Sequence, residues 1–199
     1  MLEQRIEQLF IDSADLKYQS AQILSKPMAE AVHLIMVSVT GGGKVLACGN
    51  GGSAALAQLF AATFVGRYER ERPELGAIAL SADNVLMTSV QQESGVDQVY
   101  AKQVRALGQP GDVLLVISDS GQAGNVLSAI DAAHERELSV VALTGQSGGK
   151  IQQVLRETDV HICVPHDRKA RIQEVHLLVL NGLCDGVDNQ LLGEQENTE

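Results

Sequence analysis

The sequence predicts an α/β fold in which a doubly wound, five-stranded parallel sheet is flanked by helices and preceded by a pair of N-terminal helices. Three observations lead to this prediction: five short apolar segments, stretches of helical periodicity between them, and small-residue turns after two of the segments. Strands that alternate with helices indicate right-handed crossovers and a parallel sheet that is covered on both faces.

The candidate strands are short apolar runs bounded by residues that favour turns. Their sequences are KVLACGN (44–50), GAIAL (76–80), DVLLVIS (112–118), SVVALTG (139–145) and DVHICVP (159–165). Helices are predicted between and after them, at residues 53–66, 84–107, 123–136, 148–156 and 168–192.

The first forty residues are predicted to form two helices. In the first helix, apolar residues recur near helical spacing; in the second, residues 28–39, they lie on almost all sides. Such a helix is expected to be buried, and another subunit is one candidate for what covers it. We assign residues 1–192 to a single domain, with residues 1–40 used in oligomerisation, and the polar end 193–199 to a disordered tail.

Length, composition and charge restrict the functional class. The 199 residues are 45% hydrophobic, which is enough for one core, and the net charge of −10 opposes direct contact with nucleic acid. No run approaches the roughly 18 apolar residues of a membrane span, so we expect a cytoplasmic protein without membrane contact. Cys48, Cys163 and Cys184 show no CxxC spacing and are expected to be reduced thiols.

Two predicted strands end in small-residue turns that lead into helices, which is where ligands bind in an open parallel sheet. The turns are Gly49–Ser53 and Ser118–Gly121. Glycines permit tight backbone geometry, the serines offer hydroxyls, and each helix N-terminus favours an anion. One such turn is only weakly specific, but two that converge favour a phosphate site. The candidate ligand-binding residues of these turns are Asn50, Gly51, Gly52, Ser53, Ser118, Asp119 and Ser120.

Three segments resemble the phosphoheptose (sedoheptulose 7-phosphate) isomerases of the SIS, or sugar-isomerase, family. They are KVLACGNGGSAALAQLFAATFVGRYERERPELGAIAL, VYAKQVRALGQPGDVLLVIS and ARIQEVHLLVLNGLCD. The resemblance covers nearly the whole chain and implies a flavodoxin-like sheet, a homotetramer and a sugar phosphate as ligand. Within the family, the segments VYAKQVRALG, RIQE and NGLCD resemble the branch of proteins that associate with the replication initiator DnaA.

The isomerase resemblance implies a zinc ion and a catalytic set that this sequence retains only in part. The resemblance implies that the isomerases have a metal-binding His at the position of Leu59, a catalytic Glu at that of Thr63 and a metal-binding His at that of Asn181. The Gln of the family is retained here as Gln173. Leu has no donor atom for zinc, and Thr and Asn do not transfer protons near neutral pH. We therefore expect no metal, no cofactor and no catalytic residue. Gln173 remains a candidate ligand-binding residue, as does Arg67, although Arg67 also fits a solvated charged segment.

The second turn departs from the resemblance as well. The isomerases favour STSGNS, whereas this chain has SDSGQA at 118–123, which removes two hydroxyls and adds the Asp119 carboxylate. If this carboxylate faces a phosphate, the repulsion is about 4 kcal/mol per unit charge at about 4 Å and an effective dielectric near 20. If it points outward or caps the helix, most of that cost disappears.

Three functional hypotheses follow. The sequence favours a catalytically silent SIS homotetramer that regulates chromosomal replication by binding DnaA, with Leu191 and Leu192 as partner-binding residues. The alternative is a phosphoheptose isomerase that converts sedoheptulose 7-phosphate to D-glycero-D-manno-heptose 7-phosphate for lipopolysaccharide core synthesis. The third is a sensor that binds a sugar phosphate without turnover. His166 and His176 are expected to be packing, subunit-contact or surface residues.

Overall fold

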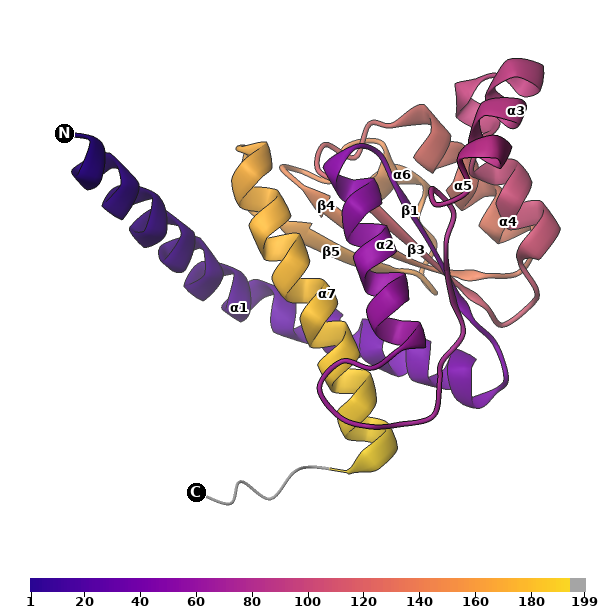
Figure 1. Ribbon diagram of the computed structural model, residues 1–199, viewed down its shortest axis with the longest axis horizontal. Helices are drawn as coiled ribbons and strands as arrows, with labels where there is room; N and C mark the ends of the chain where they lie inside the picture. Colours follow the sequence, from indigo (N-terminus) through magenta and orange to yellow (C-terminus); the bar gives the residue numbers. More distant parts are fainter. Residues whose placement is uncertain (194–199) are drawn as a thin grey trace.

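A parallel sheet of five strands forms the centre of the protein (Figure 1). The computed structural model describes residues 1–193. The strands are β1 (Val45–Gly49), β2 (Ala77–Ala79), β3 (Val113–Ser118), β4 (Ser139–Gly145) and β5 (Val160–Val164), in the order β2-β1-β3-β4-β5. All four neighbouring pairs are parallel, and this strand order is the flavodoxin-like one. The predicted fold class is therefore confirmed.

Helices cover both faces of the sheet and create two separate cores (Figure 1). Helices α1 (Leu2–Thr40), α2 (Gly52–Val65) and α7 (Lys169–Leu192) pack on one face, where they meet side chains such as Leu115 and Ile117. The other face carries α3 (Asn84–Ser94), the 3-10 turn η1 (Val96–Gln98), α4 (Ala101–Leu107), α5 (Gly124–Glu135) and α6 (Ile151–Val154). Leu114 and Val116 point to this side, because successive side chains of a strand face opposite ways.

The predicted pair of N-terminal helices is wrong, because the two periodic runs form one helix, α1, of 39 residues. Pro27 lies inside it and removes one backbone N–H from the helical hydrogen bonds. Packing on both sides of Pro27 keeps the helix continuous, since Leu24 and Ala31 are buried and Met28 lies against Gly182 of α7.

The predicted helix over 84–107 is also divided, into α3, η1 and α4. Gly95 ends α3 with φ +85°, a conformation that glycine adopts without strain and that a helix cannot contain. The predicted helix over 148–156 shrinks to the four residues of α6. Of the predicted disordered tail, residues 194–199 lie outside the described part of the chain.

Helix α1 is long enough and apolar enough to cross a bilayer by length and composition, with a mean hydropathy of 1.2 in one window. Its C-terminal half nevertheless packs on the protein itself, where Ala31 and Ile35 are fully buried and belong to the core shared with α7 and the sheet. Core packing therefore explains part of the apolar character of this half, since 28% of that window is buried.

Candidate functional site

The first predicted turn, at the carboxyl end of β1, needs its glycines for close approach to two other elements. A Cβ atom on Gly49 would lie 2.7 Å from the carbonyl oxygen of Ile117 in β3. A Cβ atom on Gly52 would lie 2.9 Å from Nε2 of Gln173 in α7. The glycines therefore bring the N-terminus of α2 against β3 and α7 at the carboxyl edge of the sheet.

The N-terminus of α2 is left without a side-chain cap. Gly51, at the N-cap position, has φ +56°, and no side chain among residues 1–193 caps the first turn of the helix. Ser53 lies in that turn and is buried. A helix N-terminus favours an anion because its dipole end is positive. The N–H groups of Ser53 and Ala54 already donate to the carbonyls of Asn50 and Gly51, each at 3.0 Å.

Asn50, a predicted ligand residue, is exposed and its side chain is held in place by its neighbours. Its amide donates to Oδ1 of Asn125 at 2.8 Å, and Asn125 donates back to Oδ1 of Asn50 at 2.9 Å. The hydroxyl of Tyr100 donates to the carbonyl of Gly49. Sequence reasoning missed Asn125 and Tyr100, because they are distant in the chain; the segment VYAKQVRALG was the available signal.

The second predicted turn, at the end of β3, packs against the loop that follows β4. Gly121 has φ +65°, its carbonyl accepts the N–H of Ile151 at 3.1 Å, and a Cβ atom on it would lie 2.0 Å from the carbonyl of Gly148. Ser118 is buried and Ser120 is half-buried. The carboxyl ends of β1, β3 and β4 therefore lie side by side, as predicted.

The first two turns of α7 complete this edge. Gln173 lies against Gly52, and its buried Nε2 has no hydrogen-bond partner among residues 1–193. His176 is fully buried, and its Nε2 lies 3.0 Å from the carbonyl of Thr144. Burial lowers the pKa of His176, while the Thr144 hydrogen bond and the charge of Asp119 oppose the shift. A neutral imidazole that donates through Nε2 leaves Nδ1 as an acceptor, and this buried atom also has no partner in the described chain.

Asp119 is turned toward α7. Its Oδ2 lies 3.1 Å from Nζ of Lys169, the first residue of that helix. The two atoms are close enough for an ion pair but are not aligned for a hydrogen bond, so the buried Oδ2 keeps an unfilled acceptor position. We call the two turns, 49–53 and 118–121, together with the first two turns of α7 the turn site.

The residues present do not fit the zinc ion that the isomerase resemblance implies. Leu59 is half-exposed and has no donor atom for a metal. The backbone carbonyl of Thr63 accepts a hydrogen bond from Nη2 of Arg72 at 3.4 Å. No group of three or more His, Cys, Asp or Glu side chains within residues 1–193 is placed to hold a metal ion.

Two further predictions concern residues outside the turn site. Arg67 follows the C-terminus of α2, about 20 Å from Ser53 at 1.5 Å per residue, and it pairs with the exposed Glu71. Within one chain, Arg67 is therefore not brought to the two turns. Leu191 packs against the core of its own chain, whereas Leu192 is 36% exposed.

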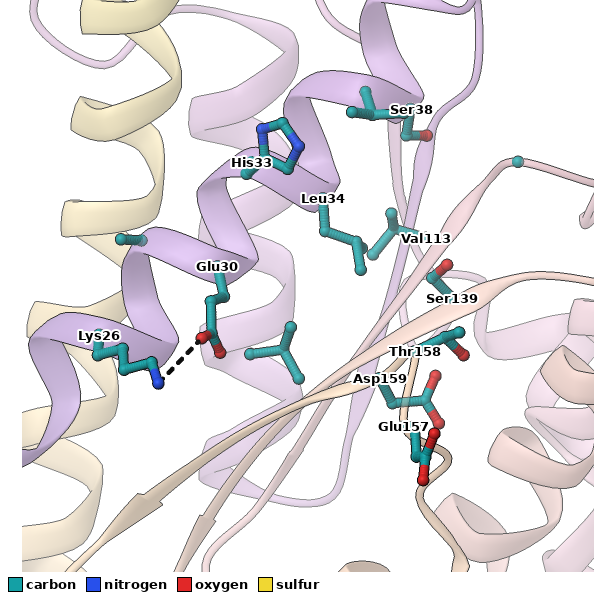
Figure 2. A pocket seen from close by; sticks show the side chains of 14 residues that line it. Lys26, Glu30, His33, Leu34, Ser38, Val113, Ser139, Glu157, Thr158 and Asp159 are labelled. Carbon is teal, nitrogen blue, oxygen red and sulfur yellow. Dashed lines mark ion pairs between the residues drawn. The ribbon is translucent and has the colours of Figure 1, made fainter.

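A cavity of about 830 Å³ lies at the opposite edge of the sheet (Figure 2). Lys26, Glu30 and His33 face it from α1, and Glu157 and Asp159 face it from the segment around the start of β5. None of the predicted ligand-binding residues lines it. Ligands of open parallel sheets bind at the carboxyl ends of the strands, so we place the candidate site at the two turns and not at this cavity.

Comparisons with known proteins agree with the fold and the sequence. The model of the SIS domain family matches residues 10–145. A phosphoheptose isomerase of Methylibium petroleiphilum is 61% identical over 198 residues, which are 100% of this chain and 99% of that protein. The structure of phosphoheptose isomerase from Neisseria gonorrhoeae has a TM-score of 0.90 at 46% identity, with 95% of this chain and 100% of that chain covered. The one from Francisella tularensis has a TM-score of 0.92 at 42% identity, covering 95% and 99%.

These findings correct the functional interpretation of the sequence. The hypothesis of a catalytically silent DnaA-binding regulator is wrong, because relatives that match along the full chain at high identity are phosphoheptose isomerases. Identity at most positions of the chain is stronger evidence of family membership than the changes at Leu59, Thr63 and Asn181 or the short segments shared with the DnaA-associating branch. This protein belongs to the SIS-domain family and, within it, to the phosphoheptose isomerases.

Proposed function

We propose that the protein is an aldose–ketose isomerase that binds a sugar phosphate at the turn site. Its proposed substrate is sedoheptulose 7-phosphate, and its product is D-glycero-D-manno-heptose 7-phosphate. The observation that carries the proposal is the 61% identity, over the whole chain, to the phosphoheptose isomerase of Methylibium petroleiphilum.

The geometry of the turn site supports the binding half of this proposal. Ser53, Ser118 and Ser120 carry hydroxyls at the carboxyl ends of two adjacent strands, β1 and β3. The uncapped N-terminus of α2 adds a positive dipole end at the same edge. Gln173 offers an unpaired amide donor from α7. Together these groups suit the oxygens of a phosphate and of sugar hydroxyls.

The catalytic half requires a group that moves a proton between neighbouring carbons. Leu59, Thr63 and Asn181 cannot do this, so the proposal assigns no role to them. The titratable side chains at the turn site include Asp119 and Lys169, with His176 behind them, while Arg171 and Glu174 of the same two turns of α7 are paired with each other at 2.8 Å. We also propose that these positions hold no zinc, which metal analysis of the purified protein tests.

Turnover and binding are measured separately to test the proposal. We expect purified protein to convert sedoheptulose 7-phosphate above the blank rate, and Gln173→Ala to abolish the conversion, because the amide that faces Gly52 is removed. A matched control is Gln58→Ala, which removes an exposed amide from α2. Calorimetric binding without turnover would contradict the isomerase activity but support the binding site. If the protein shows no binding and no turnover, the proposed activity and the proposed binding site are both wrong.

We further propose that the protein acts as a cytoplasmic homotetramer. Exposed apolar side chains on the N-terminal half of α1 support self-association: Leu2 is 70%, Phe10 74% and Tyr18 77% exposed. This half of the helix projects beyond the sheet (Figure 1). An apolar face of this kind on a helix usually marks a contact with another protein chain.

A further inference from the structure

The ion pair between Asp119 and Lys169 joins the second turn to α7 at the mouth of the turn site. Nζ of Lys169 lies 3.1 Å from Oδ2 of Asp119, with side-chain exposures of 66% and 21%. The lysine is therefore mostly in solvent, while the carboxylate sits deeper between Ser118 and Ser120. A pair this exposed contributes little to the stability of a fold.

Lys169 also occupies an unfavourable place in its helix. It is the first residue of α7, whose N-terminus has no side-chain cap, and a cation there opposes the positive end of the helix dipole. Neither helix stability nor fold stability accounts for a lysine at this position. Its ammonium is instead placed where it faces the turn that carries the serine hydroxyls.

The charges around the second turn explain what such a lysine would do. A phosphate dianion that enters next to Asp119 meets a carboxylate a few ångströms away, and this repulsion weakens binding by orders of magnitude if nothing offsets it. Gln173 is uncharged, and His176 is fully buried with a lowered pKa, so neither supplies a positive charge at neutral pH. Arg171 is a cation of the same two turns, but it pairs with Glu174 at 2.8 Å and donates to the carbonyl of Leu9 in α1. Lys169 is the cation that the structure shows paired with Asp119.

We propose that Lys169 is a specificity-determining residue that makes the second turn able to accept a phosphate group. In the free protein its ammonium neutralises Asp119, and in the complex it contacts both the carboxylate and the phosphate. The unfilled acceptor position on Oδ2 of Asp119 then receives a hydroxyl of the sugar. This inference rests on the proposed binding of a sugar phosphate at the turn site.

A double-mutant cycle tests the inference through affinity for sedoheptulose 7-phosphate, measured by calorimetry at neutral pH. Lys169→Met leaves Asp119 unpaired and is expected to weaken binding at least about tenfold, whereas Lys169→Arg keeps the charge and stays within about threefold of wild type. Asp119→Asn removes the repulsion, so Asp119→Asn/Lys169→Met is expected to bind within about threefold of wild type.

Two controls make the outcome specific. Lys26→Met removes the same charge from an exposed pair at the opposite edge, where Nζ lies 3.9 Å from Glu30, and should not change affinity. Uncharged sedoheptulose should bind wild type and Lys169→Met alike. If Lys169→Met binds as tightly as wild type, or if the double variant is no tighter than Lys169→Met, the inference is wrong while the proposed function stands. If wild type binds no sugar phosphate, the proposed function and the inference both fail.

Discussion

Individual side chains decide which chemical groups meet at the turn site. The side-chain amide of Asn50, a predicted ligand residue, forms two reciprocal hydrogen bonds with the amide of Asn125. Gln173, which the sequence also proposed, keeps a free buried donor. His176 lies directly behind this site, fully buried, and its imidazole is held by the carbonyl of Thr144. The burial of this imidazole leads us to expect that the stability of the fold depends on pH.

Burial lowers the pKa of His176 below its usual 6.5, so the unfolded chain takes up a proton at a higher pH than the folded chain does. The stability that the neutral imidazole contributes is therefore present above about pH 6.5 and is lost as the pH falls through the folded pKa. We expect the free energy of unfolding to fall more steeply from about pH 7 to about pH 5 in wild type than in His176→Gln.

Urea unfolding at several pH values measures this difference. Gln is a suitable replacement because its amide can still donate to the Thr144 carbonyl without titrating. His161, whose pKa burial also lowers, is present in both proteins, so its contribution cancels in the comparison. Parallel pH profiles for the two proteins would show that protonation of His176 is not coupled to unfolding.

Elements are positioned by contacts between segments far apart in the chain. The segment between α2 and β2 is tied to α7 by Arg72, whose Nε donates to Oδ1 of Asp188 at 2.6 Å. Both side chains are buried, at 0% and 3% exposure, and the guanidinium lies 5.6 Å from the ring centre of Phe64. This pair fixes the C-terminal halves of α2 and α7 against each other, and so it helps set the position of the turn site at their N-terminal ends.

Removal of one member of this pair leaves a buried charge without a partner. We expect Arg72→Met to lower the free energy of unfolding by about 3 to 5 kcal/mol, and Arg72→Met/Asp188→Leu to recover most of that loss. The exposed pair of Arg67 with Glu71 is the matched control, and Arg67→Met should stay within about 1 kcal/mol of wild type. Chemical denaturation measures the free energy of unfolding of wild type and of the three variants. If the double variant is as unstable as Arg72→Met, an unpaired buried carboxylate is not the cause of the loss.

In the complete fold, packing within one chain does not explain the exposed apolar side chains of α1. Its C-terminal half packs on the sheet and α7, but its N-terminal half projects past the sheet with apolar side chains exposed (Figure 1). Near α7 this half is tied down by the hydroxyl of Ser13, which donates to Glu174 at 2.7 Å, and by Arg171, which donates to the carbonyl of Leu9 at 3.0 Å. A helix fixed in this way presents a defined apolar face to a second copy.

Charge on that face should break the assembly. We expect wild type to elute as a tetramer in size-exclusion chromatography with light scattering, and Phe10→Glu/Tyr18→Glu to elute as a smaller species, because each introduced carboxylate would be buried at the contact. Val85→Glu changes a side chain of similar exposure, 78%, on α3 and should leave the tetramer intact. A double variant that remains tetrameric would place the contact elsewhere.

The fold class could be predicted from the sequence, and the two small-residue turns suggested where a ligand would bind. Strands of five to seven mostly apolar residues, alternating with helices, indicate a sheet buried on both faces, and all four strand pairs are indeed parallel. The glycines of the two turns marked where the backbone comes close to other elements, and Gly49 and Gly121 have this role in the structure. Helical periodicity could not show that α1 runs through Pro27, since the packing that keeps it continuous comes from α7.

The sequence could not predict which side chains come together at the turn site. The tertiary structure paired Asp119 with Lys169 and joined Asn50 to Asn125. It also showed that Leu59 and Thr63 lie on a helix whose first turn still has the geometry of an anion site. Residues 50 or more positions apart meet because crossovers bring strand ends to one edge, and sequence periodicity contains no information on those distances.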